Sequence, residues 1–517
     1  MSKRLLLALC IPLLLTGLTA HAQKRVKIQN ADKLKGGSAN GERFERLLGN
    51  VVLTQNKTTI YCDSAYFYKS KNTVEAFGRV RITEGDSVTI TARRLDYDGN
   101  EKKAKLRNNV VFTKLAMATL YTDHLDYERP ANKAYYYNGG RLVDSINVLT
   151  SQRGYYNVNS NLASFKKNVV VVNPDYTMMS DSLQYNSRTK IILFVAKTTV
   201  VNKDSSTFVY EGGQYDTKTK RSDLQQGAGE SPDYAIQGLQ YDLDAVRSIY
   251  KIRGNVVMSS KKENLIIHGQ ASDYYKLRGI TKIYNNAFIA KVTDDQDTLY
   301  MTADTLVSIE SNDPAKKRIL AYHNVKIFKK NLQGKADSLE YRASDSTLFF
   351  YTNPVLWTEG NQMTADSIRM LIKRNTIDKI VMVGNSFVIS RDTLLNFNQI
   401  KGRRMTAEFN GKQINRVFVE GNGESIYFAL DDKTLALIGM NKIICSNIII
   451  RFKEGRVNNL TFLVKPEANF VPPHEFITEE KTLKGFLWKE DEKPSKTDVV
   501  KKPDQEQPLP QSARKRL

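Results

Sequence analysis

An aspartate recurs at one position of a short segment repeated along the chain, and it is the first candidate for chemistry. Stacked carboxylates at a fixed spacing could bind a cation or act as an acid and a base. In two other copies Arg93 and Gln237 take this position, which a ladder of metal ligands would not readily tolerate. An Asp at a strand bend more often accepts a local backbone hydrogen bond. We therefore expect a structural role, and no metal site, for Asp63, Asp123, Asp181, Asp304, Asp337 and Asp366.

The other reactive residue types do not form a catalytic pattern. Four histidines lie beyond residue 22, at scattered positions without the spacing of metal ligands. The sequence contains no nucleophile elbow, phosphate-binding loop or dinucleotide fingerprint. We expect a protein that is not an enzyme and that needs no cofactor.

The aspartate belongs to a repeat of the type A-D-S-L-x-Y, which returns fourteen times, roughly every 32 residues. A period in this range is typical of architectures in which each unit buries its apolar face against its neighbours. Leu183 and Tyr185 alternate with Ser182 and Gln184, and this period of two indicates half-buried strands. We expect an all-β chain with about three short strands per unit, roughly 40 over residues 23–471, in two facing sheets or one V-shaped rolled sheet.

A second element of the repeat is a Gly-Asn or Asn-Asn step followed by a β-branched run. Examples are GNVVL (49–53), NNVVF (108–112) and GNVVM (254–258). Gly and Asn tolerate left-handed backbone conformations, and such dipeptides commonly form tight turns. The pattern predicts that these steps are the turns between consecutive strands.

One face of the strands is apolar and is the candidate binding surface. An acyl chain loses about 0.8 kcal/mol per CH₂ on moving from an apolar site into water, so a lipid carrier needs continuous apolar surface. The same residues could instead close a dry β-sandwich core, and a register error of one residue would invert the face. The row that we expect to point inward, and to line such a groove, is Leu95, Tyr97, Leu125, Tyr127, Leu183, Tyr185, Leu239, Tyr241, Leu306, Leu339, Tyr341 and Ile368.

The two ends of the chain differ from its body. Residues 1–22 read as a cleaved secretory signal, with a basic start, an apolar run and the A-x-A site at Ala20–Ala22. Residues 472–517 are rich in Pro and mixed charge and are predicted to be a capping segment, 479–490, followed by a disordered tail. Between them, 23–471 is the repetitive body. Cys62 and Cys445 would be free thiols in an exported protein.

The chain is strongly basic, with a net charge of +22. The signal carries +2 and residues 472–517 carry +1, so most of the charge lies on the body. A basic exported protein suggests an anionic partner, such as a phosphorylated lipid or an acidic polysaccharide; a solvated surface that keeps a long sheet in solution is the alternative. No recognition helix or RNA-binding signature supports a nucleic-acid partner.

The repeated A-D-x-L-x-Y followed by G-N-V resembles the OstA-like family, to which the periplasmic lipopolysaccharide-transport protein LptA belongs. The start of the body, VKIQNADKLKG…ERLLGNVVLTQ (26–55) and then IYCDSAYFY, is similar to the start of that domain. Through its internal copies the resemblance covers residues 23–471. The chain is roughly three times as long as a minimal member and lacks a C-terminal run of membrane-barrel strands.

The resemblance implies a β-jellyroll, a V-shaped stack of antiparallel strands whose apolar groove shields the acyl chains of lipopolysaccharide. It implies a periplasmic bridge or carrier between inner and outer membranes of a Gram-negative bacterium. The expected partners are lipopolysaccharide or another anionic lipid, and jellyroll domains of both membranes added end-on to the edge strands. The alternatives are an exported β-solenoid that binds or cleaves polysaccharide, and a passive surface scaffold.

Overall fold

The computed structural model describes residues 25–500, apart from residues 86–87, 115–117, 145, 263, 294–296, 374–375, 412, 432, 454–455 and 478–480. The predicted signal, 1–22, and the end of the predicted tail, 501–517, lie outside the described residues. The chain divides into two compact units. Unit 1 comprises Met1–Asn173 and Gln184–Arg188, and unit 2 comprises Pro174–Leu183 and Thr189–Leu517.

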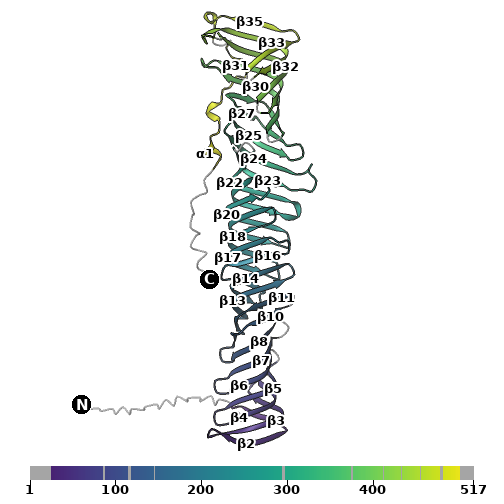
Figure 1. Ribbon diagram of the computed structural model, residues 1–517, viewed down its shortest axis with the longest axis vertical. Helices are drawn as coiled ribbons and strands as arrows, with labels where there is room; N and C mark the ends of the chain where they lie inside the picture. Colours follow the sequence, from purple (N-terminus) through teal and green to yellow (C-terminus); the bar gives the residue numbers. More distant parts are fainter. Residues whose placement is uncertain are drawn as a thin grey trace, which may run out of the picture. The chain divides into compact units, whose positions relative to one another are not determined.

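Unit 1 is built from antiparallel strands, each paired with strands close to it in the sequence (purple to blue in Figure 1). Its strands are β1 (Lys27–Asn30), β2 (Lys33–Ala39), β3 (Glu42–Gln55), β4 (Thr58–Tyr68), β5 (Thr73–Glu84), β6 (Val88–Asp98), β7 (Lys103–Lys114), β8 (Ala118–Glu128), β9 (Lys133–Tyr136), β10 (Gly140–Asp144), β11 (Asn147–Ser151), β12 (Arg153–Asn157) and β13 (Leu162–Asn173). The strand β14 (Tyr176–Asn186) contributes residues to both units.

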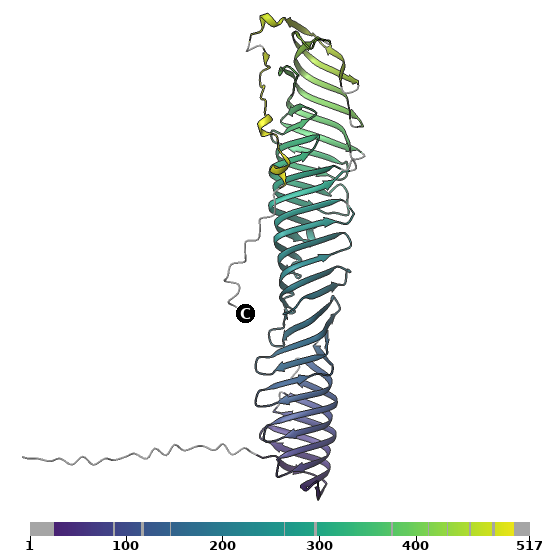
Figure 2. The ribbon, with the colours of Figure 1, turned by 60° about the vertical axis from the view of Figure 1, so that its left-hand side comes forward.

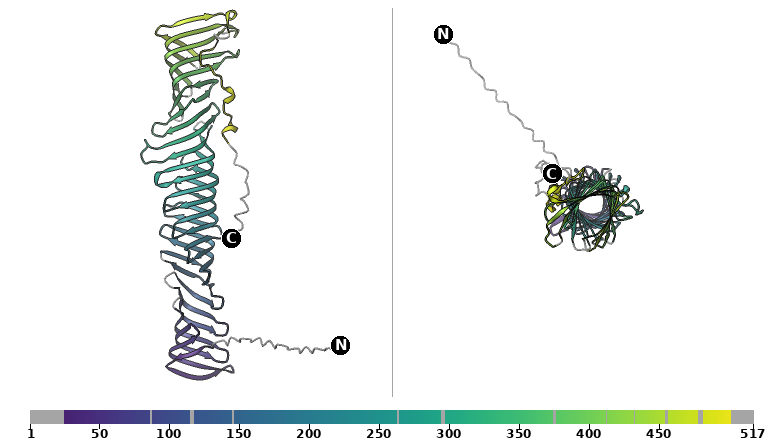
Figure 3. Two further views of the ribbon diagram at one scale, coloured as in Figure 1. Left: turned by 180° about the vertical axis from the view of Figure 1, so that it is seen from behind. Right: turned by 90° about the horizontal axis from the view of Figure 1, so that it is seen from above.

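Unit 2 continues in the same antiparallel way, and its strands lie side by side in the view from behind (teal to green in Figure 3). They are β15 (Ile191–Phe194), β16 (Thr198–Asn202), β17 (Thr207–Asp216), β18 (Arg221–Glu230), β19 (Tyr234–Asp244), β20 (Ile249–Ser260), β21 (Leu265–Tyr275), β22 (Ile280–Val292), β23 (Thr298–Ile309), β24 (Arg318–Lys329), β25 (Leu332–Arg342), β26 (Thr347–Tyr351), β27 (Val355–Thr358), β28 (Asn361–Thr364), β29 (Ser367–Lys373), β30 (Thr376–Arg391), β31 (Phe397–Asn410), β32 (Gln413–Leu430), β33 (Leu437–Lys453), β34 (Arg456–Leu463) and β35 (Glu467–Val471).

The all-β prediction is confirmed, and the prediction of three short strands per repeat is wrong. Most repeats consist of two strands of ten or more residues, for example β5 and β6 with 12 and 11 residues. The long strands bend where their pairing is interrupted for one to three residues. Between β4 and β5, pairing stops after Tyr61 and Arg81 and resumes at Ser64 and Phe77. Gly78, inside the interruption, has a left-handed φ of 96°.

The Gly-Asn and Asn-Asn steps lie at these bends and not at turns between strands, which corrects the second prediction. Gly49 and Asn50 lie inside β3, with φ of 73° and 43°, and Asn108 and Asn109 lie inside β7. Two successive left-handed residues form a bulge that turns a strand sharply while the ladder continues on both sides. One strand can therefore run through two layers, with the bend as a corner between them.

The corners divide each unit into two facing layers. We call the layer that contains the Leu-x-Tyr segments the first layer and the layer that contains the runs after the Gly-Asn steps the second layer. In unit 2, Met382 and Met405 of the first layer belong to the same buried cluster as Ile327 and Leu356 of the second. The core therefore lies between the layers, as in a jellyroll. Of the two predicted arrangements, two facing sheets or one rolled sheet, the structure has the single rolled sheet, because the described strands all belong to one sheet.

The C-terminal segment packs against unit 2. Residues 481–500 run along its strands (yellow in Figure 2), and Leu483, within the predicted capping segment, shares a buried cluster with Val471 of β35. Residues 491–500, predicted to belong to a disordered tail, are also packed there. The segment includes the short helix α1 (Lys496–Val499) and two deeply buried side chains, Leu483 and Val499, which are 3% and 0% exposed. Apolar anchors hold this segment despite its high content of charge and proline.

Candidate functional site

The interior between the layers is the candidate functional site. Ten of the twelve residues predicted to point inward are buried there, with Leu95, Leu125, Leu183 and Ile368 fully enclosed. They come from the first-layer parts of β6, β8, β14, β19, β23, β25 and β29. Second-layer residues such as Ile90 are also buried. Whether these residues bind lipid stays a prediction.

Two residues of the predicted row are placed differently. Leu239 is 39% exposed, because in β19 the corner falls at residues 238–239, between the pairs of Gln237 and Gln240. Leu239 thus takes the outward corner position that Asp63 takes in β4, and its inward assignment is wrong. Tyr341 shares the face of Leu339 and is only half-buried.

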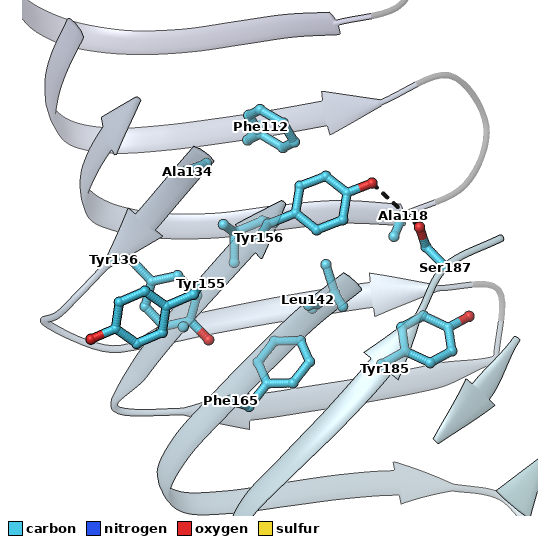
Figure 4. A pocket seen from close by; sticks show the side chains of 13 residues that line it. Phe112, Ala118, Ala134, Tyr136, Leu142, Tyr155, Tyr156, Phe165, Tyr185 and Ser187 are labelled. Carbon is cyan, nitrogen blue, oxygen red and sulfur yellow. Dashed lines mark hydrogen bonds between the residues drawn. The ribbon is translucent and has the colours of Figure 1, made fainter. Parts of the chain in front are cut away.

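Unit 1 has a cavity of about 50 Å³ between its layers (Figure 4). Its lining is apolar apart from tyrosine and serine hydroxyl groups. Three of the lining residues are small, Ala134, Gly154 and Ala163. The ring of Tyr136 packs directly over Gly154, where a Cβ would come within 2.2 Å of it. The remaining lining residues are Phe112, Ala118, Leu120, Tyr136, Leu142, Tyr155, Tyr156, Phe165, Tyr185 and Ser187.

Polar contacts join the two layers on the side opposite the corners, which we call the mouth of unit 1. The hydroxyl of Tyr97 donates a hydrogen bond to Oε1 of Gln55 at 2.5 Å. Tyr97 lies near the end of the first-layer part of β6, and Gln55 ends the second-layer part of β3. Gln55 Nε2 donates to the carbonyl of Gly99 at 2.7 Å. Burial raises the pKa of Tyr97 to about 12, so its hydroxyl remains a donor at neutral pH.

The same contact recurs in other repeats of unit 1. Tyr127 donates to Oε2 of Glu84 at 3.0 Å, and Arg129 Nε reaches Oε1 of the same carboxylate at 2.6 Å. Tyr185 donates to the buried carboxylate of Asp144. Burial and the neighbouring Glu84 raise the pKa of Tyr127. We call these pairs, Tyr97–Gln55, Tyr127–Glu84 and Tyr185–Asp144, the mouth latches.

The sequence analysis found the tyrosines of the latches and missed their partners. Gln55, Glu84 and Asp144 are each the last residue of a second-layer strand, in VVLTQ, VRITE and GRLVD. Their separations of 29 and 60 residues match one and two repeats. A polar residue at a fixed repeat position was therefore the available signal.

Several of the repeated aspartates form structural hydrogen bonds, but with a neighbouring strand and not with the local backbone as predicted. Asp63 Oδ2 accepts a hydrogen bond from the backbone N–H of Arg79 at 3.0 Å, across the corner of the neighbouring strand, and Arg79 lowers its pKa. Asp304 and Asp366 accept from the side-chain amides of Asn324 and Asn385 at 2.9 and 3.1 Å. In these three cases the Asp side chain of one strand is hydrogen-bonded to the corner of the next strand.

Three further observations bear on chemistry. Among the residues that the structure describes, no group of three or more His, Cys, Asp or Glu side chains is placed to hold a metal ion. Cys62 and Cys445 are free and buried. Across the same described ranges, no helix has the length and apolar character needed to cross a membrane.

The comparisons with known proteins agree with this architecture. Residues 23–181 match the family model described as OstA-like protein. Residues 282–376 match the model of the LptA and LptD N-terminal domain lipopolysaccharide-transport proteins. Residues 23–181 and 282–376 are therefore OstA/LptA-like domains. The families of these domains are transport proteins and not enzymes.

A solved structure also shows similarity to part of the chain. It is LptH of Pseudomonas aeruginosa, described as the LptA-homologous periplasmic component of a lipopolysaccharide transport device. The match has 13% identity and a TM-score of 0.20, and it covers 22% of this chain and 79% of LptH. Comparison with curated protein sequences gives no match.

Proposed function

We propose that the protein is a periplasmic bridge or carrier that moves lipopolysaccharide, or a related anionic lipid, from the inner to the outer membrane of a Gram-negative bacterium. The acyl chains would lie between the two layers. The observation that carries the proposal is the apolar interior, lined repeat after repeat by the Leu-x-Tyr segments and opened into a cavity in unit 1. The domain families of the chain support the choice of cargo.

The interior suits acyl chains because transfer from water favours them by about 0.8 kcal/mol per CH₂. Close packing elsewhere in the interior means that the layers must separate locally for a lipid to enter. The mouth latches are the contacts that separation would break in unit 1. A typical hydrogen bond contributes about 1 kcal/mol net, so each latch is cheap to open compared with the burial of one acyl chain.

The end strands support the proposed end-on partners. Within the described residues, β1 and β2 pair only with β3, and β34 and β35 pair only with β33. Each of these strands therefore has one edge free to add a strand of another jellyroll. The C-terminal edge also exposes apolar side chains, with Phe470 52% and Leu460 41% exposed. No nucleotide-binding motif is present in the sequence, so a partner would supply the energy for transport.

Depletion of the protein tests the function in cells. We expect newly made lipopolysaccharide to accumulate at the inner membrane, and wild-type protein supplied in trans to restore its export. Ala134→Leu, which fills the cavity from β9, should restore export poorly. Lys133→Leu is the matched control, because Lys133 is the exposed neighbour on the same strand, and it should restore export fully.

Both variants need to fold, since extra methylene groups in a packed interior commonly cost about 1–3 kcal/mol. Circular dichroism and a thermal melt of each purified variant check this. Normal lipopolysaccharide export in depleted cells would contradict the proposal, and a selective loss of a surface polysaccharide would favour the polysaccharide-binding alternative.

A further inference from the structure

The outward face of the second layer in unit 2 is apolar, unlike its counterpart in unit 1. In β5 of unit 1, Arg81 and Thr83 flank the inward-facing Ile82. In β30, Phe387 and Ile389 flank the inward-facing Val388 and are only 5% and 1% exposed. A strand that is apolar on both faces must be covered on both. The cover on this outward face is the C-terminal segment.

Apolar side chains of the segment fit into this face at defined places. Leu483 lies in a buried cluster with Phe387, Ile389, Ile426, Phe428, Met440 and Val471. Phe486 and Trp488 pack against Phe397, with ring centroids 5.3 and 5.1 Å apart. Leu487, between them, is 63% exposed. From Phe486 to Trp488 the contact thus uses alternate side chains, and a turn separates these residues from Leu483.

Two buried glutamines hold the backbone of the segment. Gln399 of β31, which is fully buried, donates to the carbonyl of Lys481 at 2.9 Å and accepts from the N–H of Leu483 at 2.8 Å. Gln362 of β28, 1% exposed, donates to the carbonyl of Leu487 and accepts from the N–H of Lys489, both at 2.7 Å. Each amide therefore pairs with a peptide backbone as a neighbouring strand would.

Further contacts extend the site along the segment. Lys401 Nζ donates to the carbonyl of Lys484 at 3.0 Å, and Lys335 forms an ion pair with Glu492 at 2.9 Å. Val499 of α1 is fully buried, and α1 lies against β23 and β24. The strands that form the second layer pair with one another without any contribution from the segment. The segment therefore packs on a sheet whose strand pairing is complete without it.

We propose that this outward face is a peptide-binding groove and that its ligand is the chain's own residues 481–499. The ligand class is a peptide with the anchors Leu-x-x-Phe-x-Trp and a turn between the first two, where the N–H of Phe486 donates to the carbonyl of Leu483 at 3.0 Å. Gln362 and Gln399 recognise it through its backbone. The segment is a separable ligand, able to leave the groove and to return. Its release uncovers an apolar face that is closed in the resting protein. This proposal does not depend on lipid binding.

The test uses the full chain with a protease site inserted after Glu479, cut once the protein has folded. A fluorescent synthetic peptide of residues 481–500 is then added, and its binding is followed by fluorescence anisotropy. We expect saturable binding that unlabelled peptide competes away. Gln362→Ala and Gln399→Ala should each weaken binding about tenfold or more, because each removes two hydrogen bonds to the peptide.

Matched controls are available on both sides of the contact. Gln270→Ala removes a half-buried glutamine of β21 whose side-chain oxygen accepts from the backbone N–H of Asn255, and it should leave binding unchanged. In the peptide, Leu483→Ala should abolish binding and Leu487→Ala should not. The proposal would be overturned if the cut segment never exchanged with added peptide, or if the peptide did not bind. Equal binding to the glutamine variants and to the control variant would also overturn it.

Discussion

At the scale of single residues, the Asp and the Gly-Asn step of the repeat form one contact, although they are well separated in the sequence. The Asp of one strand lies over the Gly-Asn corner of the next, and a Cβ on Gly384 would come within 2.2 Å of Asp366 Oδ2. Gly is needed there for its left-handed backbone and also for the space that the carboxylate fills. The co-occurrence of Asp and Gly-Asn in the repeat reflects this one contact between neighbouring strands.

Substitution of two glycines separates these causes. Gly384 and Gly360 have the same φ of 76°, but a Cβ on Gly360 would meet nothing within 4 Å. We expect Gly360→Ala to lower the free energy of unfolding by about 1 kcal/mol, the cost of a left-handed Ala. Gly384→Ala should cost about 1–2 kcal/mol more, because Asp366 must move and lose its bonds to Asn385. Urea unfolding measures the free energy of unfolding of both variants. Equal losses would contradict a stabilising contact between Asp366 and the corner at Gly384.

The mouth latches give a second prediction at this scale. Tyr127→Phe removes the hydroxyl that donates to Glu84, while Arg129 still contacts the carboxylate. We expect a loss of about 1 kcal/mol in the free energy of unfolding. Tyr121→Phe, at a tyrosine that is 43% exposed, should cost less than about 0.5 kcal/mol. Urea unfolding of the two variants side by side measures the difference, and indistinguishable curves would show that the latch contributes nothing.

Most inward residues were predictable from the sequence. Side chains of a strand alternate between its two faces with a period of two, and this does not depend on which strands pair with it. Leu239 was misplaced because the corner position is set by pairing with β20, which the local pattern does not record. The latch partners were missed for the same reason, since Gln55 and Tyr97 are 42 residues apart. Contacts between repeats are the part of the site that local spacing does not show.

At the scale of elements, the long strand with one corner is the unit of construction. The Gly-Asn steps were expected to be turns because the dipeptide has the same left-handed preference in a hairpin and in a bulge. Burial of polar positions was also not predictable from alternation. Glu340 occupies a polar position of β25, yet it is only 8% exposed because Arg318, Arg342 and Tyr351 surround its carboxylate.

Glu340 makes the stability of unit 2 depend on pH. Hydrogen bonding to Arg342, with Tyr351 and Arg318 nearby, lowers the pKa of Glu340 below its ordinary value of 4.5. A lowered pKa in the folded state stabilises the fold fully above about pH 4.5, and this contribution is lost as the pH falls through the folded-state value. Glu340→Gln should therefore cost about 2 kcal/mol at pH 7 and clearly less at pH 3.

Urea unfolding at the two pH values measures this dependence. Glu467→Gln, at an exposed residue of β35, is the control and should leave the free energy of unfolding within about 0.5 kcal/mol at both. A Glu340→Gln effect that is as large at pH 3 as at pH 7 would show that the side chain stabilises unit 2 by packing and not by its charge.

At the scale of the whole molecule, repetition determines what the chain can do. Each repeat adds two strands, a corner and a stretch of apolar interior, so length extends the interior without a new kind of site. The two family matches, residues 23–181 and 282–376, fall in different parts of the chain and share this plan. The all-β architecture was predictable because the repeat is regular. The course of residues 481–500 was not, because it depends on contacts with the apolar outward face of unit 2, which lies far from the segment in the sequence.

The central claim is that acyl chains lie between the two layers, and adjacent residues of one strand test it most directly. A photo-crosslinking amino acid replaces either Tyr185, which lines the cavity, or Gln184, which alternates with it in β14. In cells that make lipopolysaccharide normally, the proposed function predicts lipid adducts at position 185 and few or none at position 184. Equal adducts at both positions, or none at position 185, would contradict it.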